Sequence, residues 1–148
     1  MERLRIVQKY FNSIIIIRLM LSLVFISEGI QKFIFSDTLG VGRFIKIGIP
    51  HPGIMAPFVG IVEIVCGGLI LLGLFTRLAT LPLLISMFVA FSTTKIPLLL
   101  EKGFWAMAHE ARTDWCMILG LIFLFIVGSG RWSLDYFRTQ PMKSRESS

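Results

Sequence analysis

Long apolar runs alternate with short polar stretches along the sequence. Four of the runs predict helices over about residues 12–35, 53–75, 78–100 and 111–127. The first three reach the length of about 20 residues that a helix needs to cross a bilayer, whereas the fourth does so only if its polar leading turn faces inward. We therefore expect an all-α membrane protein, a bundle of four transmembrane helices.

Polar segments divide this chain into three parts. Residues 1–11 form a basic leader, residues 12–136 the membrane domain and residues 137–148 a disordered polar tail. The apolar run after the leader is interrupted by Arg18 and is longer than the core of a cleaved signal peptide. We expect the leader to remain attached.

The loop between the first two helices is rich in glycine and proline. It predicts a short interfacial helix around residues 41–47, which Arg43 and Lys46 anchor at the membrane surface. His51 lies between two prolines, where a solvated loop histidine is favoured over a ligand.

Composition supports the membrane assignment. Of the 148 residues, 55% are hydrophobic and only 16% are charged, and the mean hydropathy is +0.78, which is more apolar surface than a soluble domain of this length can bury. The net charge of +6 does not indicate nucleic acid, because the basic residues are scattered over loops and termini. Cys66 and Cys116 have neither CxxC spacing nor neighbouring histidines, so no metal site is predicted.

The distribution of lysine and arginine predicts the orientation. One set lies in the leader, the second turn and the C-terminal segment: Arg3, Arg5, Lys9, Arg77, Arg131, Arg138, Lys143 and Arg145. The opposite loops hold a smaller set: Arg43, Lys46, Lys102 and Arg112. Because the more basic side of a membrane protein faces the cytoplasm, both termini are predicted to be cytoplasmic.

One carboxylate, Glu63, lies near the middle of the second apolar run. Within hydrocarbon it has to be protonated, paired with a cation or turned toward a polar cavity. Ala56 and Gly60 precede it with the small-xxx-small spacing that lets a neighbouring helix approach closely. A purely structural ion pair explains the carboxylate about as well as chemistry does.

Several other polar residues could join Glu63 in one pocket that opens outward. On the first helix, Arg18, Glu28 and Lys32 share a side, and either Lys32 or Arg18 is the expected counter-ion of Glu63. Glu28 and Lys32 are also spaced for a local pair at the helix end, an alternative that stays open. The candidate catalytic residues are Glu63, Lys32 and His109, and the candidate ligand-binding residues are Arg18, Glu28, Lys95 and Asp114.

The chain resembles the DoxX family of small bacterial membrane proteins over roughly residues 12–136. The stretches that carry the resemblance are RLMLSLVFISEGIQKF, FVGIVEIVCGGLILLGLFTRLA and GSGRWSLD. Its recurring positions correspond here to Arg18, Gly29, Lys32, Gly60, Glu63, Gly68, Arg77, Gly130, Arg131, Ser133 and Asp135. Ser129 occupies a position at which proline is common in this family. For the closing motif, a structural role in ending one helix and capping a short segment is favoured.

The resemblance implies a multi-pass protein of the bacterial cytoplasmic membrane, often an oxidoreductase component. A quinone could meet Glu63, Lys32 and His109 as hydrogen-bond or proton-transfer partners. The sequence has no flavin fingerprint, cysteine-rich cluster or intramembrane histidine pair, so electrons would come from a redox partner subunit or another cofactor. The alternative is a non-catalytic scaffold or assembly partner, and a homo-oligomer stays open for either.

Overall fold

The computed structural model describes residues 2–130 and 132–139, with side chains for residues 13–130 and 132–137. Within this part of the chain there are only helices, which confirms the all-α prediction. They are α1 (Glu2–Ile34), α2 (Val41–Lys46), α3 (Pro52–Leu72), α4 (Thr76–Lys102), α5 (Phe104–Val127) and α6 (Leu134–Thr139). The predicted leader is helical from Glu2 as the first turns of α1, and α2 lies where a short helix was predicted.

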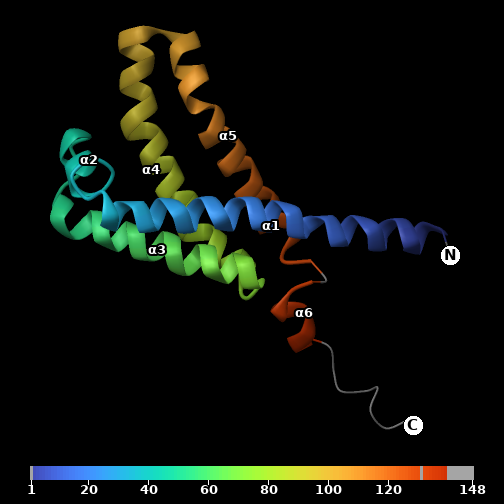
Figure 1. The fold of residues 1–148 in the computed structure, drawn as a ribbon. Helices are drawn as coiled ribbons and strands as arrows, with labels where there is room; N and C mark the ends of the chain where they lie inside the picture. Colours follow the sequence, from blue (N-terminus) through green and yellow to red (C-terminus); the bar gives the residue numbers. More distant parts are fainter. Residues whose placement is uncertain (1, 131, 140–148) are drawn as a thin grey trace.

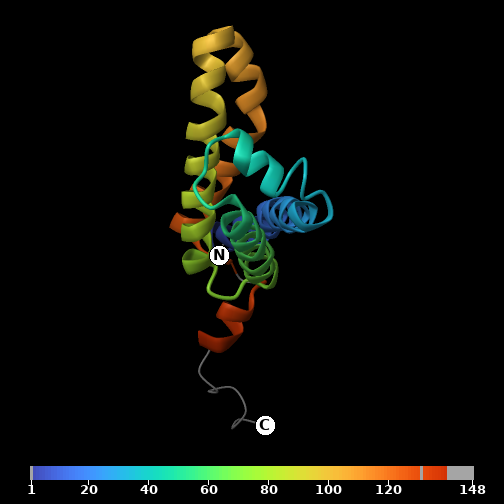
Figure 2. The ribbon, with the colours of Figure 1, turned by 90° about the vertical axis from the view of Figure 1, so that its left-hand side faces the viewer.

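The long helices form two antiparallel pairs. α1 packs along α3, and α4 packs along α5 (Figure 1). The two pairs cross steeply, as Figures 1 and 2 show from perpendicular directions. The expected four-helix bundle is therefore not a near-parallel one, in which neighbouring helices cross at about 20°. The reason is that the pairs touch mainly where α3 passes into α4, and α1 contacts α5 only near the crossing.

Glycines let α1 and α3 approach each other closely. A Cβ atom on Gly29 would lie 2.7 Å from the carbonyl oxygen of Gly60, and one on Gly67 would lie 3.0 Å from Cγ1 of Ile26. Ala56 is also buried, so the small-residue face predicted from Ala56 and Gly60 contacts a neighbouring helix. Gly68 has no atom within 4 Å of such a Cβ and does not take part.

The hydrophobic core lies where the two pairs cross. Each long helix contributes to it, with Leu21 and Phe25 from α1, Cys66 and Ile70 from α3, Ala79 and Leu83 from α4, and Met117, Leu121 and Leu124 from α5. At the centre, a Cβ on Gly120 of α5 would lie 3.1 Å from Leu21. This crossing fixes one pair against the other.

The α4–α5 hairpin is more regular than the sequence indicated. Residues 101–114 are helical on both sides of Gly103, which makes the turn at φ +82°. Pro97 lies inside α4 and does not end it. The start predicted at residue 111 is therefore wrong by two turns, because Phe104 can begin α5 directly after the glycine.

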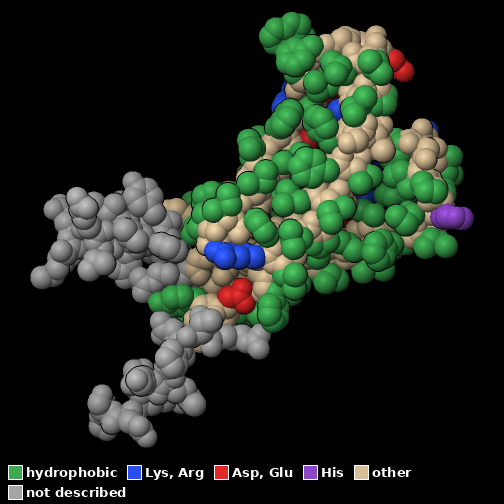
Figure 3. Space-filling model, turned by 180° about the vertical axis from the view of Figure 1, so that it is seen from behind, with side chains coloured by type: hydrophobic (Ala, Val, Ile, Leu, Met, Phe, Trp, Pro, Cys, Tyr) green, Lys and Arg blue, Asp and Glu red, His purple; other side chains and the backbone are tan. Residues whose placement is uncertain are grey.

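Within the part of the chain that the structure describes, three helices are long and apolar enough to cross a membrane: Ser13–Ile34, Pro52–Leu72 and Thr76–Lys102. α5 is not among them, since its leading half carries Glu110, Arg112 and Asp114. Hydrophobic side chains dominate the face in Figure 3, with few charged groups between them. At the C-terminal end, α6 covers residues 137–139 of the predicted tail, whereas residues 140–148 and Arg131 lie outside the described residues.

Candidate functional site

A buried ion pair joins the two helices of the first pair. Nζ of Lys32 on α1 lies 2.6 Å from Oε2 of Glu63 on α3, and these side chains are only 11% and 9% exposed. Of the two counter-ions that the sequence left open, Lys32 is the one that contacts Glu63. The pair lies beside the Gly29–Gly60 contact, since a Cβ on Gly29 would be 3.2 Å from Cβ of Glu63.

Glu28 forms the outer edge of this pair. Its Oε2 atom lies 3.9 Å from Nζ of Lys32, and its side chain is 47% exposed. The local pairing of Glu28 and Lys32 is therefore long, and Lys32 faces mainly Glu63. A hydrogen-bonded ammonium and carboxylate, shielded from water, can donate, accept and pass on a proton. That is the chemistry open to these three side chains.

Arg18 belongs to a different place in the fold. Its guanidinium donates to the carbonyl oxygens of Ile70 at 2.9 Å and Leu71 at 2.7 Å, and to those of Ser129, at 3.0 Å, and Trp132. It is 2% exposed. The expectation that Arg18 lines one pocket with Glu63 is therefore wrong, because the fourteen residues that separate it from Lys32 correspond to about 21 Å of helix. Its donors hold the end of α3 to the segment that follows α5.

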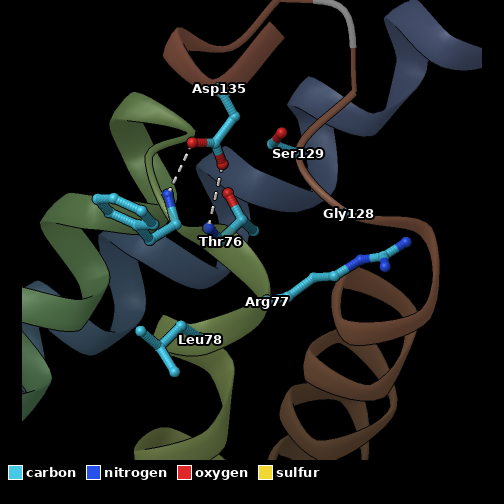
Figure 4. Close-up of a pocket in the computed structure, with 7 residues that line it drawn as sticks. Thr76, Arg77, Leu78, Gly128, Ser129 and Asp135 are labelled. Atoms are coloured by element: carbon cyan, nitrogen blue, oxygen red, sulfur yellow. Dashed lines mark hydrogen bonds between the residues drawn. The ribbon is translucent and has the colours of Figure 1, made fainter. Parts of the chain in front are cut away.

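The positions after α5 hold the helix ends together, as Figure 4 shows. The carboxylate of Asp135 accepts hydrogen bonds from the N–H groups of Phe75, at 3.0 Å, and Thr76, at 3.4 Å, and so caps α4. Nη2 of Arg77 donates to the carbonyl of Ile126 at 2.9 Å. Ser133 donates to the carbonyl of Gly130 at 2.7 Å. The contacts of the closing motif are structural, but Asp135 caps the long helix α4 instead of the short segment for which it was predicted.

A cavity of about 450 Å³ lies between these helix ends. Its lining includes Thr76, Arg77, Gly128, Ser129 and Asp135 (Figure 4). The Thr76 hydroxyl is buried and has no hydrogen-bond partner among the described residues. Backbone carbonyls and helix N–H groups already engage Arg77 and Asp135, so this cavity is part of the joint between helices.

Lys95 and Asp114 lie together on the α4–α5 hairpin. Their Nζ and Oδ2 atoms are 3.2 Å apart, and Lys95 also donates to the carbonyl of Glu110 at 3.1 Å. His109 lies beside Arg112, whose Nη1 is 2.9 Å from Nε2 of the ring. On this hairpin, Lys95 therefore pairs with Asp114, and His109 with Arg112. None of the four forms an ion pair or hydrogen bond with Lys32 or Glu63 within the described residues.

A second cavity, of about 540 Å³, opens between α2 and this hairpin. Its polar lining consists of Arg43, Thr94, Lys95, Lys102, His109 and Glu110. Lys32 and Glu63 do not line it, so the single predicted pocket is divided into a helix-pair site and a hairpin site. Arg43 is the one link, because its charge acts on the Glu63 carboxylate.

Two features of these sites were missed by sequence reasoning. Arg43 was expected only to anchor a surface helix, although a basic residue on a short helix after a tight loop can also face its neighbours. The acceptors of Arg18 are backbone carbonyls, which leave no side-chain signal in a sequence. Within the described residues, no three His, Cys, Asp or Glu side chains come together as metal ligands.

The apolar helices and the ion pair between them define an integral membrane protein, and comparison with known sequences gives its family. The sequence model of the DoxX family matches residues 13–96, and the chain belongs to this family. The chain is 57% identical over 129 residues to the uncharacterized membrane protein Rv3486 of Mycobacterium tuberculosis, an alignment that covers 83% of this chain and 79% of that protein. No solved structure matches the chain.

Proposed function

We propose that this DoxX-family protein is the membrane component of a quinone-linked oxidoreductase in the bacterial cytoplasmic membrane. The observation that carries the proposal is the contact of 2.6 Å between Lys32 and Glu63, buried between two membrane-crossing helices. Intramembrane ionisable groups are costly in hydrocarbon and commonly mark proton or ligand sites. A quinone is a lipid-soluble substrate that needs protons within the membrane, where the Lys32–Glu63 pair would lie.

Reduction of a quinone to a quinol consumes two electrons and two protons. In the proposed reaction, the ammonium of Lys32 donates a hydrogen bond to a quinone oxygen, and the Lys32–Glu63 pair delivers one proton to that oxygen as the two electrons arrive. Water at the exposed Glu28 side supplies the second proton to the other quinone oxygen and returns a proton to the pair. The electrons come from a redox partner subunit. His109 lines the other cavity, so we assign the proton transfer to Lys32 and Glu63 alone.

The quinone ring would approach from the side of Glu28. The contact between Gly29 and Gly60 leaves no space between α1 and α3 at that level, whereas the Glu28 side chain is nearly half exposed. A ring in this position meets the ion pair at its accessible edge. Glu28 then limits how far the ring can enter.

We further propose that α5 crosses the membrane beside α4, which gives four spans, both termini in the cytoplasm and α2 at the outer surface. Because α5 packs along α4, its axis has to lie at the same angle to the membrane as the axis of α4. The pairing of Lys95 with Asp114 neutralises two of the charges that would oppose insertion.

Quinone retention tests the proposal directly. The protein is purified in mild detergent, and extracted quinones are quantified by mass spectrometry, followed by titration with decylubiquinone. We expect saturable binding that Glu63→Gln and Lys32→Gln each weaken about tenfold, the effect of losing one charged hydrogen bond. The exposed carboxylate of Glu101 provides the matched control, Glu101→Gln. Absence of retained quinone together with non-saturable titration would exclude the proposal.

A scaffold function is the second candidate, and one observation favours it. The hairpin beyond the crossing exposes large apolar residues, namely Ile96, Leu99, Leu100, Phe104 and Trp105. Such a surface suits another membrane protein or a second copy of this chain. Crosslinking in native membranes, followed by purification, would separate the candidates: capture of an oxidoreductase whose activity survives Glu63→Gln supports the scaffold.

A further inference from the structure

We propose that the cavity between α2 and the α4–α5 hairpin binds the phosphate of an anionic membrane lipid. This inference is independent of the quinone proposal, because neither Lys32 nor Glu63 lines the cavity. Figures 1 and 2 place α2 beside the hairpin, and the space of about 540 Å³ between them is in the usual range for small-molecule sites.

Two positive charges in this cavity have no direct partner within the described residues, although the charge of Arg43 also acts on the Glu63 carboxylate. Arg43 on α2 and Lys102 at the end of α4 both line it, and neither side chain forms an ion pair or hydrogen bond there. The third cation, Lys95, is already neutralised by Asp114. Arg43 is partly buried, and the Glu63 carboxylate on which its charge acts is already bound to Lys32 at 2.6 Å, so the guanidinium has no direct counter-ion. An anion between Arg43 and Lys102 would satisfy both.

Phosphate is the anion that fits these two groups. A guanidinium can donate two parallel hydrogen bonds to phosphate oxygens, and an ammonium binds phosphate as a compact charge. Glu110 also lines the cavity. Its carboxylate would repel a bare anion, but it can accept a hydrogen bond from a hydroxyl group, so a phosphodiester with a hydroxylated headgroup fits best.

The surroundings of the cavity indicate that the phosphate belongs to a lipid. Leu98 lies in the lining itself. Ile45 on α2 and Leu100 on α4, each two residues from a proposed phosphate ligand, are 62% and 81% exposed. Acyl chains below the phosphate would cover these apolar side chains, which free phosphate could not do.

Lipid titration of the purified full-length protein tests this assignment. The probes are dihexanoyl phosphatidylglycerol, dihexanoyl phosphatidylcholine and inorganic phosphate, with affinity measured by native mass spectrometry in detergent. We expect phosphatidylglycerol to bind at least about tenfold more tightly than the other two. Arg43→Gln should weaken its binding about tenfold, a loss of about 1.4 kcal/mol.

Lys46→Gln is the matched control, because Lys46 lies on the same helix, carries the same charge and does not line the cavity. It should change affinity by less than about twofold. A second pair, Lys102→Gln against Arg77→Gln, which is exposed and does not line this cavity, covers the case in which Arg43→Gln fails to fold. If the two variants of each pair lose affinity equally, the proposed site is wrong. If inorganic phosphate or phosphatidylcholine binds as tightly as phosphatidylglycerol, the assignment to an anionic lipid is wrong.

Discussion

Two buried cations of α1 are satisfied in different ways. Lys32 has a close carboxylate partner, Glu63, and a more distant one, Glu28. Arg18 donates to four backbone carbonyls and forms no ion pair within the described residues. The sequence alone predicts that Glu63 is protonated, paired with a cation or turned toward a polar cavity, because an ionised carboxylate is costly in hydrocarbon, and the structure shows the pairing with Lys32. The sequence does not predict the surroundings of Arg18, since any residue can supply a carbonyl.

Removing one charge of the Lys32–Glu63 pair should destabilise the protein more than removing both. Lys32→Met or Glu63→Met leaves a buried charge without its partner, which costs about 3–5 kcal/mol when burial is complete. The double variant leaves two apolar side chains and should recover much of that loss. Thermal unfolding in detergent, followed by circular dichroism, measures the difference, with the exposed Lys46→Met as control. Additive losses in the double variant would show that the two groups do not interact.

Arg18→Lys should be poorly tolerated although it keeps the charge. Lysine has three donors on one nitrogen and cannot reach carbonyls on both sides as the planar guanidinium does. With two or more buried carbonyls left unpaired, we expect a loss of about 2–5 kcal/mol in unfolding free energy. Arg77→Lys, at an exposed arginine with one carbonyl partner, should cost under about 1 kcal/mol. Similar melting temperatures for both variants would contradict the role given to Arg18.

At the scale of elements, the glycines of α1 and α3 decide how closely the first pair packs. The sequence predicted this face from the spacing of Ala56 and Gly60, because small residues one turn apart permit close approach. It could not identify the facing residue, Gly29, by spacing, since that depends on how the two helices are aligned along each other. The chain is helical on both sides of Gly103, because this glycine alone makes the turn between α4 and α5.

Gly29→Ala should weaken the first pair, and Gly68→Ala should not. A methyl group at Gly29 meets the Gly60 carbonyl at 2.7 Å, and backbone cannot move aside as a side chain can, so overpacking should cost about 1–3 kcal/mol. At Gly68 there is open space, and alanine should stabilise the helix by up to about 1 kcal/mol. Both effects are measurable as opposite shifts in melting temperature. If both shifts have the same sign, α1 and α3 do not pack as described.

At the scale of the whole molecule, two helix pairs meet at one crossing. The four apolar runs predicted the four long helices to within about three residues at most ends, because the length of an apolar run can be counted directly in the sequence. The steep crossing was not predictable, since periodicity tells which face of a helix is buried but not the angle at which another pair lies on it. The division of the polar residues into separate sites follows from that crossing.

If α5 crosses the membrane as proposed, both termini lie on the same side, which can be tested in cells. In a Cys66→Ala, Cys116→Ala background, single cysteines at Ser36, Lys102 and Ser144 are exposed to an impermeant maleimide. We expect Ser36→Cys and Lys102→Cys to react in intact spheroplasts, and Ser144→Cys only after permeabilisation. Labelling of Ser144→Cys in intact spheroplasts would indicate that α5 does not cross.

The hydrogen bonds of Arg18 also constrain the biogenesis of the protein. Two of its acceptors, Ser129 and Trp132, follow it by 111 and 114 residues, so they leave the ribosome long after the first helix has entered the bilayer. Until then, part of this guanidinium has only water or lipid headgroups to bind. The first helix to be made is therefore among the last to reach its final position. A nascent chain that stalls before position 129 would contain an Arg18 whose hydrogen bonds to Ser129 and Trp132 cannot form, a defect that quality-control proteases can recognise.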